Sequence, residues 1–151
     1  MRFVIAMAVM AVALPSVASA ETWLPIAKGA AHVSYADPDA LSGDDTEVVV
    51  REMKVYDPPI VADGQTIQAR IVNYRFRCDS TRFKILDVEN VDETGKSLGV
   101  SAIAEDWREP VVSGTVGEKL AAFGCGQMAM DPNGAVTRSA AIRDGRWILS
   151  Q

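Results

Sequence analysis

Alternating apolar and polar residues divide much of the chain into segments typical of β-strands. The clearest runs from residue 66 to 78, where Val72, Tyr74, Phe76 and Cys78 share one parity and the residues between them are polar. Successive side chains of a strand point to opposite faces, so this segment predicts a strand with one apolar face, to which Cys78 belongs. Similar but weaker patterns predict strands at residues 31–36, 47–56, 81–91 and 98–104.

Turn residues separate these predicted strands. Residues 37–45 indicate a polar loop, and Asp57-Pro58-Pro59 is expected to end the strand before it. Residues 92–96 predict a hairpin loop, with Gly95 where a type I turn followed by a bulge needs a positive φ. The apolar parity changes between Ile85 and Leu86, which indicates either a β-bulge or a strand covered on both faces.

The pattern then changes to a helical period. Thr115 and Glu118 match a capping box, in which each side chain would bind the other residue's backbone N–H. Val116, Leu120 and Phe123 recur at helical spacing, and the following glycines can end the helix at Cys125. Strands followed by one helix predict a single α+β domain, with a short helix packed on an antiparallel sheet.

The tail from Gln127 is less regular. The adjacent apolar residues 147–149 favour extra strands, whereas a short helix near residues 137–143 is the alternative. We expect this extension, residues 127–151, to dock on the same domain as residues 21–126.

The first 20 residues predict a signal peptide. Arg2 precedes an apolar stretch from Phe3 to Leu14, and Ala18-Ser19-Ala20 matches the small-x-small pattern that signal peptidase cleaves after. The stretch is shorter than the roughly 20 residues of a membrane span. No cysteine near the junction offers a lipid attachment site. We therefore expect a periplasmic or secreted protein that begins at Glu21 and does not span the membrane.

Charge narrows the range of partners. The whole chain has a formal net charge of −5, and removal of the signal peptide takes away one arginine, which leaves −6. Nucleic acids and anionic membranes attract basic proteins, so neither is an expected general partner.

The two cysteines, Cys78 and Cys125, indicate a structural disulfide. Thiols of an exported chain normally pair in an oxidising compartment, and free or intermolecular thiols are the alternative. They are 47 positions apart, too far for a C-x-x-C redox motif, and with His32 as the only histidine a Cys2His2 zinc site cannot form within one chain. No cofactor is expected. If the bridge forms, it holds the end of the predicted helix against the apolar face of the strand at residues 66–78.

Catalytic motifs are weak. Residues 95–99 match G-x-S-x-G by letter, but Ser97 would open a hairpin strand and His32 precedes it, whereas the nucleophile elbow needs a strand-to-helix turn and a later histidine. The densest acidic cluster, residues 37–47, lacks the spacing of a calcium loop because Leu41 occupies a ligand position. We expect a non-enzymatic protein.

Basic residues gather on two adjacent predicted strands. They are Arg70, Arg75, Arg77, Arg82 and Lys84, and Arg75 and Arg77 share a face. The interpretations are a recognition surface for an acidic partner and the ordinary solvated side of a sheet. The three tryptophans, at positions 23, 107 and 147, are expected to pack in the core or at its edges.

The order of landmarks resembles the surface-adhesin protein E-like family of small exported bacterial proteins. The resemblance rests on Trp23, Tyr35-Ala36-Asp37, Cys78, the segment from Trp107 through Ser113-Gly114-Thr115, and Cys125. It implies an antiparallel sheet with a small helix, a Cys78–Cys125 bridge and a capacity for homodimers. The family's named member is an adhesin that binds host extracellular-matrix and plasma proteins.

The resemblance implies an exported binding protein for a protein or an envelope component. The alternative is a periplasmic inhibitor of a cell-wall hydrolase, or an envelope accessory protein, because small disulfide-bridged β domains also serve these functions.

Overall fold

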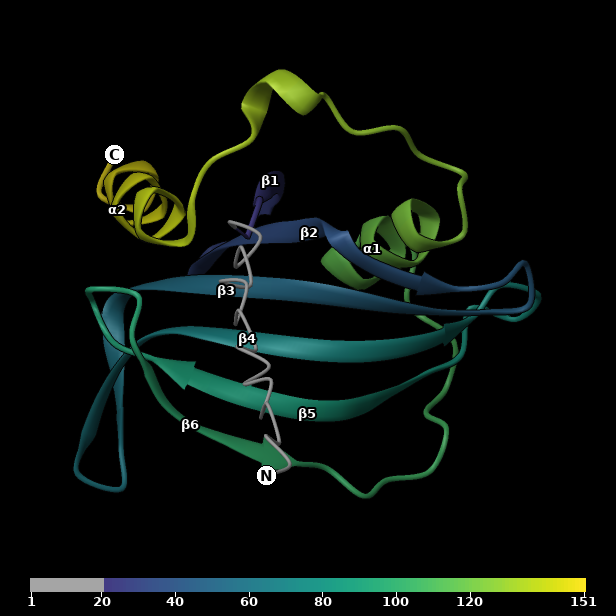
Figure 1. Cartoon of the computed structure of the whole chain (residues 1–151), viewed down its shortest axis with the longest axis horizontal. Helices are drawn as coiled ribbons and strands as arrows, with labels where there is room; N and C mark the ends of the chain where they lie inside the picture. Colours follow the sequence, from purple (N-terminus) through teal and green to yellow (C-terminus); the bar gives the residue numbers. More distant parts are fainter. Residues whose placement is uncertain (1–20) are drawn as a thin grey trace, which may run out of the picture.

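The computed structural model describes residues 21–151, so the predicted signal peptide lies outside the described residues. Six antiparallel strands form one sheet in the order of the sequence, as Figure 1 shows. They are β1 (Leu24–Lys28), β2 (His32–Gly43), β3 (Glu47–Ala62), β4 (Gln65–Arg77), β5 (Phe83–Val91) and β6 (Ser97–Ala102). The predicted α+β class and antiparallel sheet are confirmed.

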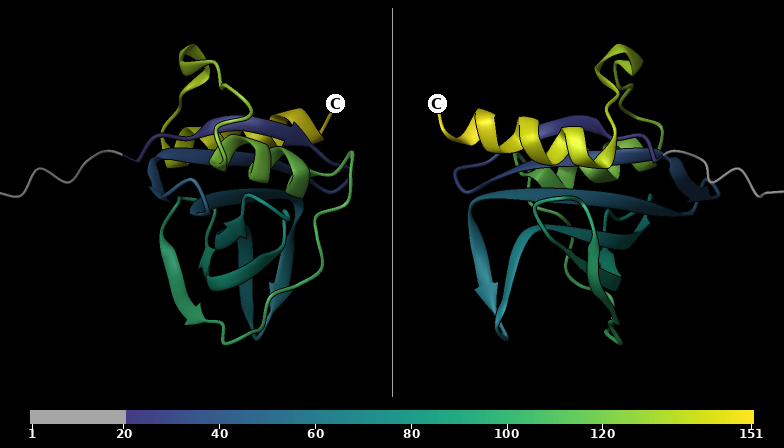
Figure 2. Two further views of the ribbon diagram at one scale, coloured as in Figure 1. Left: turned by 90° about the vertical axis from the view of Figure 1, so that its right-hand side faces the viewer. Right: turned by 60° about the vertical axis from the view of Figure 1, so that its left-hand side comes forward.

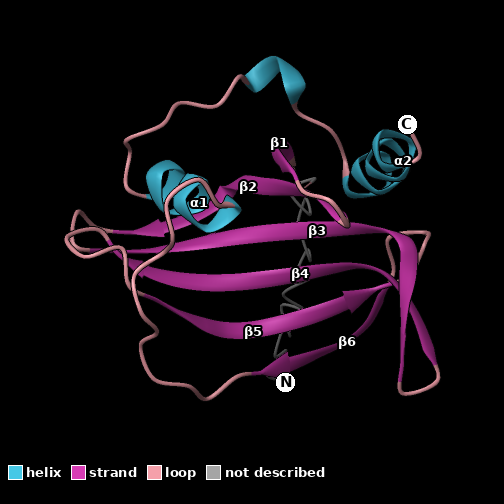
Figure 3. Cartoon of the chain, turned by 180° about the vertical axis from the view of Figure 1, so that it is seen from behind, coloured by secondary structure: helices cyan, strands magenta, loops and turns pink. Residues whose placement is uncertain are grey.

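Two α-helices accompany the sheet, α1 (Val116–Gly124) and α2 (Arg138–Leu149), with a 3-10 turn, η1 (Pro132–Gly134), between them. They lie near opposite ends of the strands (Figure 1). Seen from behind in Figure 3, the connection from α1 through η1 to α2 passes outside the β1 edge. No helix within residues 21–151 is both long and apolar enough to cross a membrane.

The preference for strands in the C-terminal tail was wrong. Thr137 caps α2 by accepting a hydrogen bond from the backbone N–H of Ala140, and the small residues Ala141 and Gly145 are buried against the sheet. At Gly145, an added Cβ would lie 2.9 Å from the Cβ of Val55, so this helix approaches β3 more closely than a side chain would allow. Contiguous apolar residues at 147–149 concealed this helical pattern.

The two helices cover opposite faces of the sheet, because the residues they contact alternate along β3 and β4. We call these the α1 face and the α2 face. The α1 face carries the buried residues Val48, Val50, Val72, Tyr74 and Phe76, which pack with Leu120, Ala121 and Phe123. The α2 face carries the buried residues Val33, Tyr35, Met53, Val55, Ala69 and Ile71, which pack with Trp23, Ala141 and Ile142.

Several strand boundaries differ from the prediction. β2 extends through the expected polar loop to Gly43, and β3 continues past Pro58 and Pro59, each across an irregularity in its pairing. β1 was not predicted. It follows Trp23, which is fully buried and forms an isolated bridge with Val136. Figure 2 shows that the sheet is strongly bent, with β4 to β6 turned away from the helices.

The structure selects one of the two alternatives for β5, the bulge, and confirms the predicted turn that follows it. The pairing of β5 with β4 shifts next to Leu86, as expected of a bulge at the parity change. In the turn to β6, Gly95 has a φ of +89°, and the Asp92 carboxylate accepts hydrogen bonds from the backbone N–H groups of Thr94 and Lys96.

The disulfide between Cys78 and Cys125 is also confirmed, and it joins the end of β4 to the C-terminal end of α1. Thr115 caps α1 as predicted, by accepting from the backbone N–H of Glu118. The second half of the capping box differs. Glu118 accepts from the backbone N–H of Gly114 and the hydroxyl of Ser113, because the chain turns tightly just before the cap.

Candidate functional site

Part of the α2 face lies beyond α2 and is not covered by a helix. Arg75, Arg77 and Lys84 project from this part of β4 and β5, and all three are partly exposed. The guanidinium carbon of Arg77 lies 4.2 Å from the centroid of the Trp107 ring, and Lys84 Nζ lies 5.2 Å from it. We call these four residues the Trp107 surface. Cations over an indole ring are attracted to its negative face, so the ring orders them without removing their charge.

Hydrogen bonds hold Trp107 in place beside β5. Arg82 donates from Nη2 to the carbonyl of Trp107 (3.2 Å) and from Nε to that of Arg108 (3.0 Å). The backbone N–H of Arg108 donates to the carbonyl of Phe83 (2.7 Å). Arg108 in turn forms an ion pair with Glu105 at 2.6 Å. Arg82 therefore positions the segment that carries Trp107, by donating from two of its nitrogens to backbone carbonyls.

The charges of the Trp107 surface are only partly compensated. Arg77 pairs with Glu47 at 3.1 Å, with both side chains well exposed. Within residues 21–151, Arg75 has no ion-pair partner, and the ring of Trp107 is the only charge-attracting contact of Lys84. The surface therefore carries more positive than negative side chains on a protein that is acidic overall.

The structure separates the predicted basic residues. Arg75 and Arg77 share the α2 face, as their spacing indicated. Arg70 projects from the other face of β4 and donates to the Asn90 side chain at 3.2 Å. Arg82 binds the backbone of the Trp107 segment. The indole at the centre of the surface was expected only to pack. Its proximity to basic residues of β4 and β5 arises from the return of the chain along β5, which no local pattern reveals.

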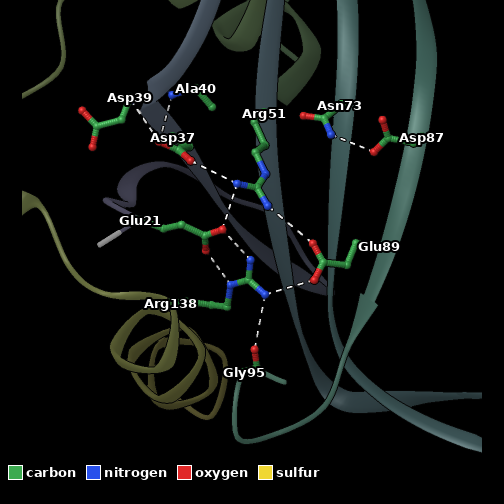
Figure 4. Close-up of polar contacts among 10 residues, drawn as sticks. All are labelled: Glu21, Asp37, Asp39, Ala40, Arg51, Asn73, Asp87, Glu89, Gly95 and Arg138. Atoms are coloured by element: carbon green, nitrogen blue, oxygen red, sulfur yellow. Dashed lines mark hydrogen bonds and ion pairs between the residues drawn. The ribbon is translucent and has the colours of Figure 1, made fainter. Parts of the chain in front are cut away.

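A cluster of partly buried charges lies on the same face beside α2, as Figure 4 shows. Arg138 of α2 binds both oxygens of Glu21 at 2.6 Å and approaches Glu89 at 3.0 Å. Arg51 of β3 reaches the same two carboxylates, at 2.9 and 3.4 Å, and also Asp37 at 3.5 Å. Arg138 donates further to the carbonyl of Gly95. The arginine cluster, as we call these five charged residues, joins the start of the described chain, three strands, a hairpin turn and α2.

The pKa shifts agree with this arrangement. Burial raises the pKa of Glu21, but hydrogen bonds from Arg138 and the charges of both arginines outweigh it, so the net shift is downward. For Asp37, burial is stronger than the hydrogen bonds from the backbone N–H groups of Asp39 and Ala40, so its pKa is raised. Each arginine is shared between carboxylates. The arrangement stabilises the docking of α2 through contacts between Arg138 and the carboxylates of Glu21 and Glu89.

The acidic residues at 37–47 do not converge. The buried Asp37 carboxylate accepts from the backbone N–H groups of Asp39 and Ala40. The Asp44 carboxylate instead accepts from the Thr46 hydroxyl and the backbone N–H groups of Thr46 and Glu47. The hydrogen bond from Thr46 is the main reason that the pKa of Asp44 falls to about 2. Among residues 21–151, no three His, Cys, Asp or Glu side chains are grouped to hold a metal ion.

Ser97 and His32 lie far apart in the sheet. Ser97 opens β6 and His32 opens β2, with three strands between them. The His32 ring lies 6.0 Å from that of Tyr56, and its pKa is lowered by burial and then by the charge of Lys54. The two residues cannot form a nucleophile–base pair.

The family model described as surface-adhesin protein E matches residues 23–126. The match begins at the buried Trp23, includes β1 to β6 and α1, and ends directly after the second cysteine. The chain belongs to the surface-adhesin protein E family. Searches of curated proteins and of solved structures found no significant match.

The family match leaves α2 outside, since it ends at residue 126. Yet α2 supplies Ala141 and Ile142 to the core and Arg138 to the arginine cluster. The matched segment therefore contains the sheet, the disulfide and the Trp107 surface, whereas one face of its core is completed by residues 127–151.

Proposed function

We propose that this protein is an exported, non-enzymatic binding protein that contacts an acidic segment of a protein or envelope partner through the Trp107 surface. Membership of the surface-adhesin protein E family is the observation that carries the proposal. The location on the molecule comes from the geometry, because this surface combines an indole ring and three basic side chains on an uncovered part of the sheet.

The residue types support a role in recognition. Tryptophan and arginine are enriched among the residues that dominate binding energy at protein interfaces. The Trp107 ring offers apolar area, and Arg75 and Lys84 offer charge without an acidic partner of their own. Because the rest of the protein is acidic, an acidic partner would be repelled elsewhere and attracted here, which favours one orientation of binding.

Export is supported by the pattern of residues 1–20 and by the disulfide, which persists in oxidising compartments. Both observations support a periplasmic or secreted location. A non-enzymatic role is supported by the separation of Ser97 from His32 and by the use of the partly buried charges of the arginine cluster as structural contacts.

Capture from the envelope fraction of the protein's own bacterium tests the proposal. We expect a protein or envelope component that binds wild type and is lost with the double variant Arg75→Glu, Lys84→Glu. The control Arg143→Glu makes the same type of charge change at an exposed site on α2 and should retain the partner. Equal capture by wild type, the double variant and the control would refute binding of the partner through the Trp107 surface.

The alternative function is inhibition of a cell-wall hydrolase. It predicts that micromolar protein slows lysozyme, whereas the binding-protein proposal predicts an unchanged rate. The same double variant separates the two further, because an inhibitor that works through another face would remain active in it.

We also propose that the protein forms homodimers through β6. Within residues 21–151 this strand pairs only with β5, so in this part of the chain its outer edge is available to pair with a second copy. Val100 on this edge strand is 63% exposed. Light scattering should show a dimer of the wild type at high concentration and a monomer of the Val100→Lys variant. A wild-type monomer at every concentration would refute the homodimer.

A further inference from the structure

A cavity lies on the α1 face, between α1, the strands β3 to β5 and the segment that follows β6. Its volume is about 250 Å³. The lining combines charged and apolar side chains. Three of its rings contact one another, with centroids 5.7 Å apart for Tyr74 and Phe76, 6.1 Å for Tyr74 and Phe83, and 5.8 Å for Phe76 and Phe83. Ile85, Val111, Val116 and Leu120 add aliphatic surface. Arg108 is exposed and marks the mouth.

One wall of this cavity carries a buried carboxylate. Glu52 is 0% exposed, and within residues 21–151 neither of its oxygens has a hydrogen bond of normal geometry. Lys54 Nζ lies 3.5 Å from Oε2, which is an ion pair at long distance. The Tyr74 hydroxyl interacts with the carboxylate outside normal hydrogen-bond geometry. Burial of a carboxylate with so few donors is costly, and Lys54 and Tyr74 use the acceptor capacity of its oxygens only in part.

The remaining charges around the cavity are balanced. Lys54 lies beside Glu52, and Arg108 at the mouth is paired with Glu105. A cationic ligand would therefore meet the charge of Lys54, and an anionic ligand that of Glu52. The arrangement favours a ligand without net charge that brings a neutral donor to the carboxylate, because a hydrogen bond to an ionised acceptor is stronger than one between neutral groups.

Size and wall chemistry define the rest of the ligand. The volume lies just below the range of about 300–1,000 Å³ that is typical of drug-sized ligands, so a molecule of one or two rings fits best. Aromatic rings pack favourably against other rings in edge-to-face or offset arrangements. Phe76 and Phe83 supply rings for such contacts, and Leu120 adds aliphatic surface to the same wall.

We propose that this cavity binds a small, uncharged aromatic molecule whose O–H or N–H group donates to Glu52. The ring lies against Phe76 and Phe83, and the donor points to the buried carboxylate. The site is independent of the Trp107 surface, which projects from the opposite face of the sheet. If the test of either site fails, the proposal for the other site is unaffected.

Phenol is the probe, titrated into the exported protein with its disulfide formed and followed by amide NMR. Shifts should concentrate in β3, β4, β5 and α1. Anisole, in which a methyl group replaces the donated hydrogen, should bind at least 10-fold more weakly than phenol. Benzylamine, which adds a positive charge, should also bind more weakly.

Two variants locate the site. Glu52→Gln keeps the shape and removes the charge, so phenol should bind about 10-fold more weakly while the protein becomes equally or more stable. Glu93→Gln makes the same change in an exposed turn and should bind phenol like wild type. Val116→Phe fills the cavity at its rim and should abolish binding without touching Glu52.

Several results would overturn the proposal. Equal affinity for phenol and anisole would show that the carboxylate accepts no hydrogen bond from the ligand. Unchanged phenol binding in both Glu52→Gln and Val116→Phe would place phenol elsewhere. If Glu52→Gln fails to fold, the ion pair with Lys54 is structural, and phenol binding that survives in Val116→Phe would then refute the site.

Discussion

Removal of the Arg138 side-chain charge should loosen α2 from the sheet. Arg138→Met keeps the aliphatic stem and removes four contacts, two to Glu21, one to Glu89 and one to the carbonyl of Gly95. A hydrogen bond to a charged group contributes about 1.5–3 kcal/mol when it is well buried. Arg138, Glu21 and Glu89 have side-chain exposures of 20%, 30% and 12%, so solvent screens these contacts and reduces their contributions.

The loss is further limited because Arg51 remains within 2.9 Å of Glu21 and 3.4 Å of Glu89, which leaves neither carboxylate isolated. We therefore expect Arg138→Met to lower the free energy of unfolding by about 3 kcal/mol at neutral pH. Urea unfolding followed by far-UV circular dichroism measures this change. The matched control is Arg143→Met on the same helix, whose exposed side chain should contribute less than about 0.5 kcal/mol. A loss for Arg138→Met as small as that of the control would refute the stabilising role of the arginine cluster.

Three further predictions concern stability. Cys125→Ser should lower the free energy of unfolding by up to about 4 kcal/mol, the chain-entropy value for a 47-residue loop, and loosen α1 while the strands stay paired. Reduced wild type is its control in urea unfolding, and unchanged stability would contradict the role of the bridge. Gly145→Ala should destabilise by about 1–3 kcal/mol in thermal unfolding because its Cβ would overlap Val55, whereas Gly134→Ala, with 3.5 Å to its nearest neighbour, should not. Glu21→Gln should be less stable than wild type above pH 4.5, the unperturbed pKa, and the difference should vanish as the pH falls through the lowered folded pKa. A stability difference between wild type and Glu21→Gln that does not change with pH would refute the stabilising role of the Glu21 charge.

Local sequence signals predicted the parts of the fold that depend on near neighbours. The parity of Val72, Tyr74 and Phe76, the bulge next to Leu86 and the cap at Thr115 each follow from a few adjacent residues. The disulfide needed one further step, the inference of an oxidising compartment. In all four cases the physical cause lies within a short segment or in a single pair of residues.

The parts that sequence reasoning missed depend on tertiary packing. The buried face of α2 consists of small residues such as Ala141 and Gly145. Gly145 lets the helix lie close to β3, a contact that only the folded structure reveals. The arginine cluster joins residues from position 21 to position 138. Glu52 left a detectable signal, because it shares the parity of Val48 and Val50 and therefore predicts a carboxylate on an apolar face.

The central claim is that the Trp107 surface binds the partner. Biolayer interferometry with the captured partner measures it most directly, comparing wild type with Trp107→Ala and with the exposed-site control Arg143→Glu. We predict at least 10-fold weaker binding for Trp107→Ala, an unchanged affinity for the control, and a wild-type affinity that falls as salt increases, because salt screens exposed charges. Wild-type affinity in Trp107→Ala, with no dependence on salt, would contradict the account.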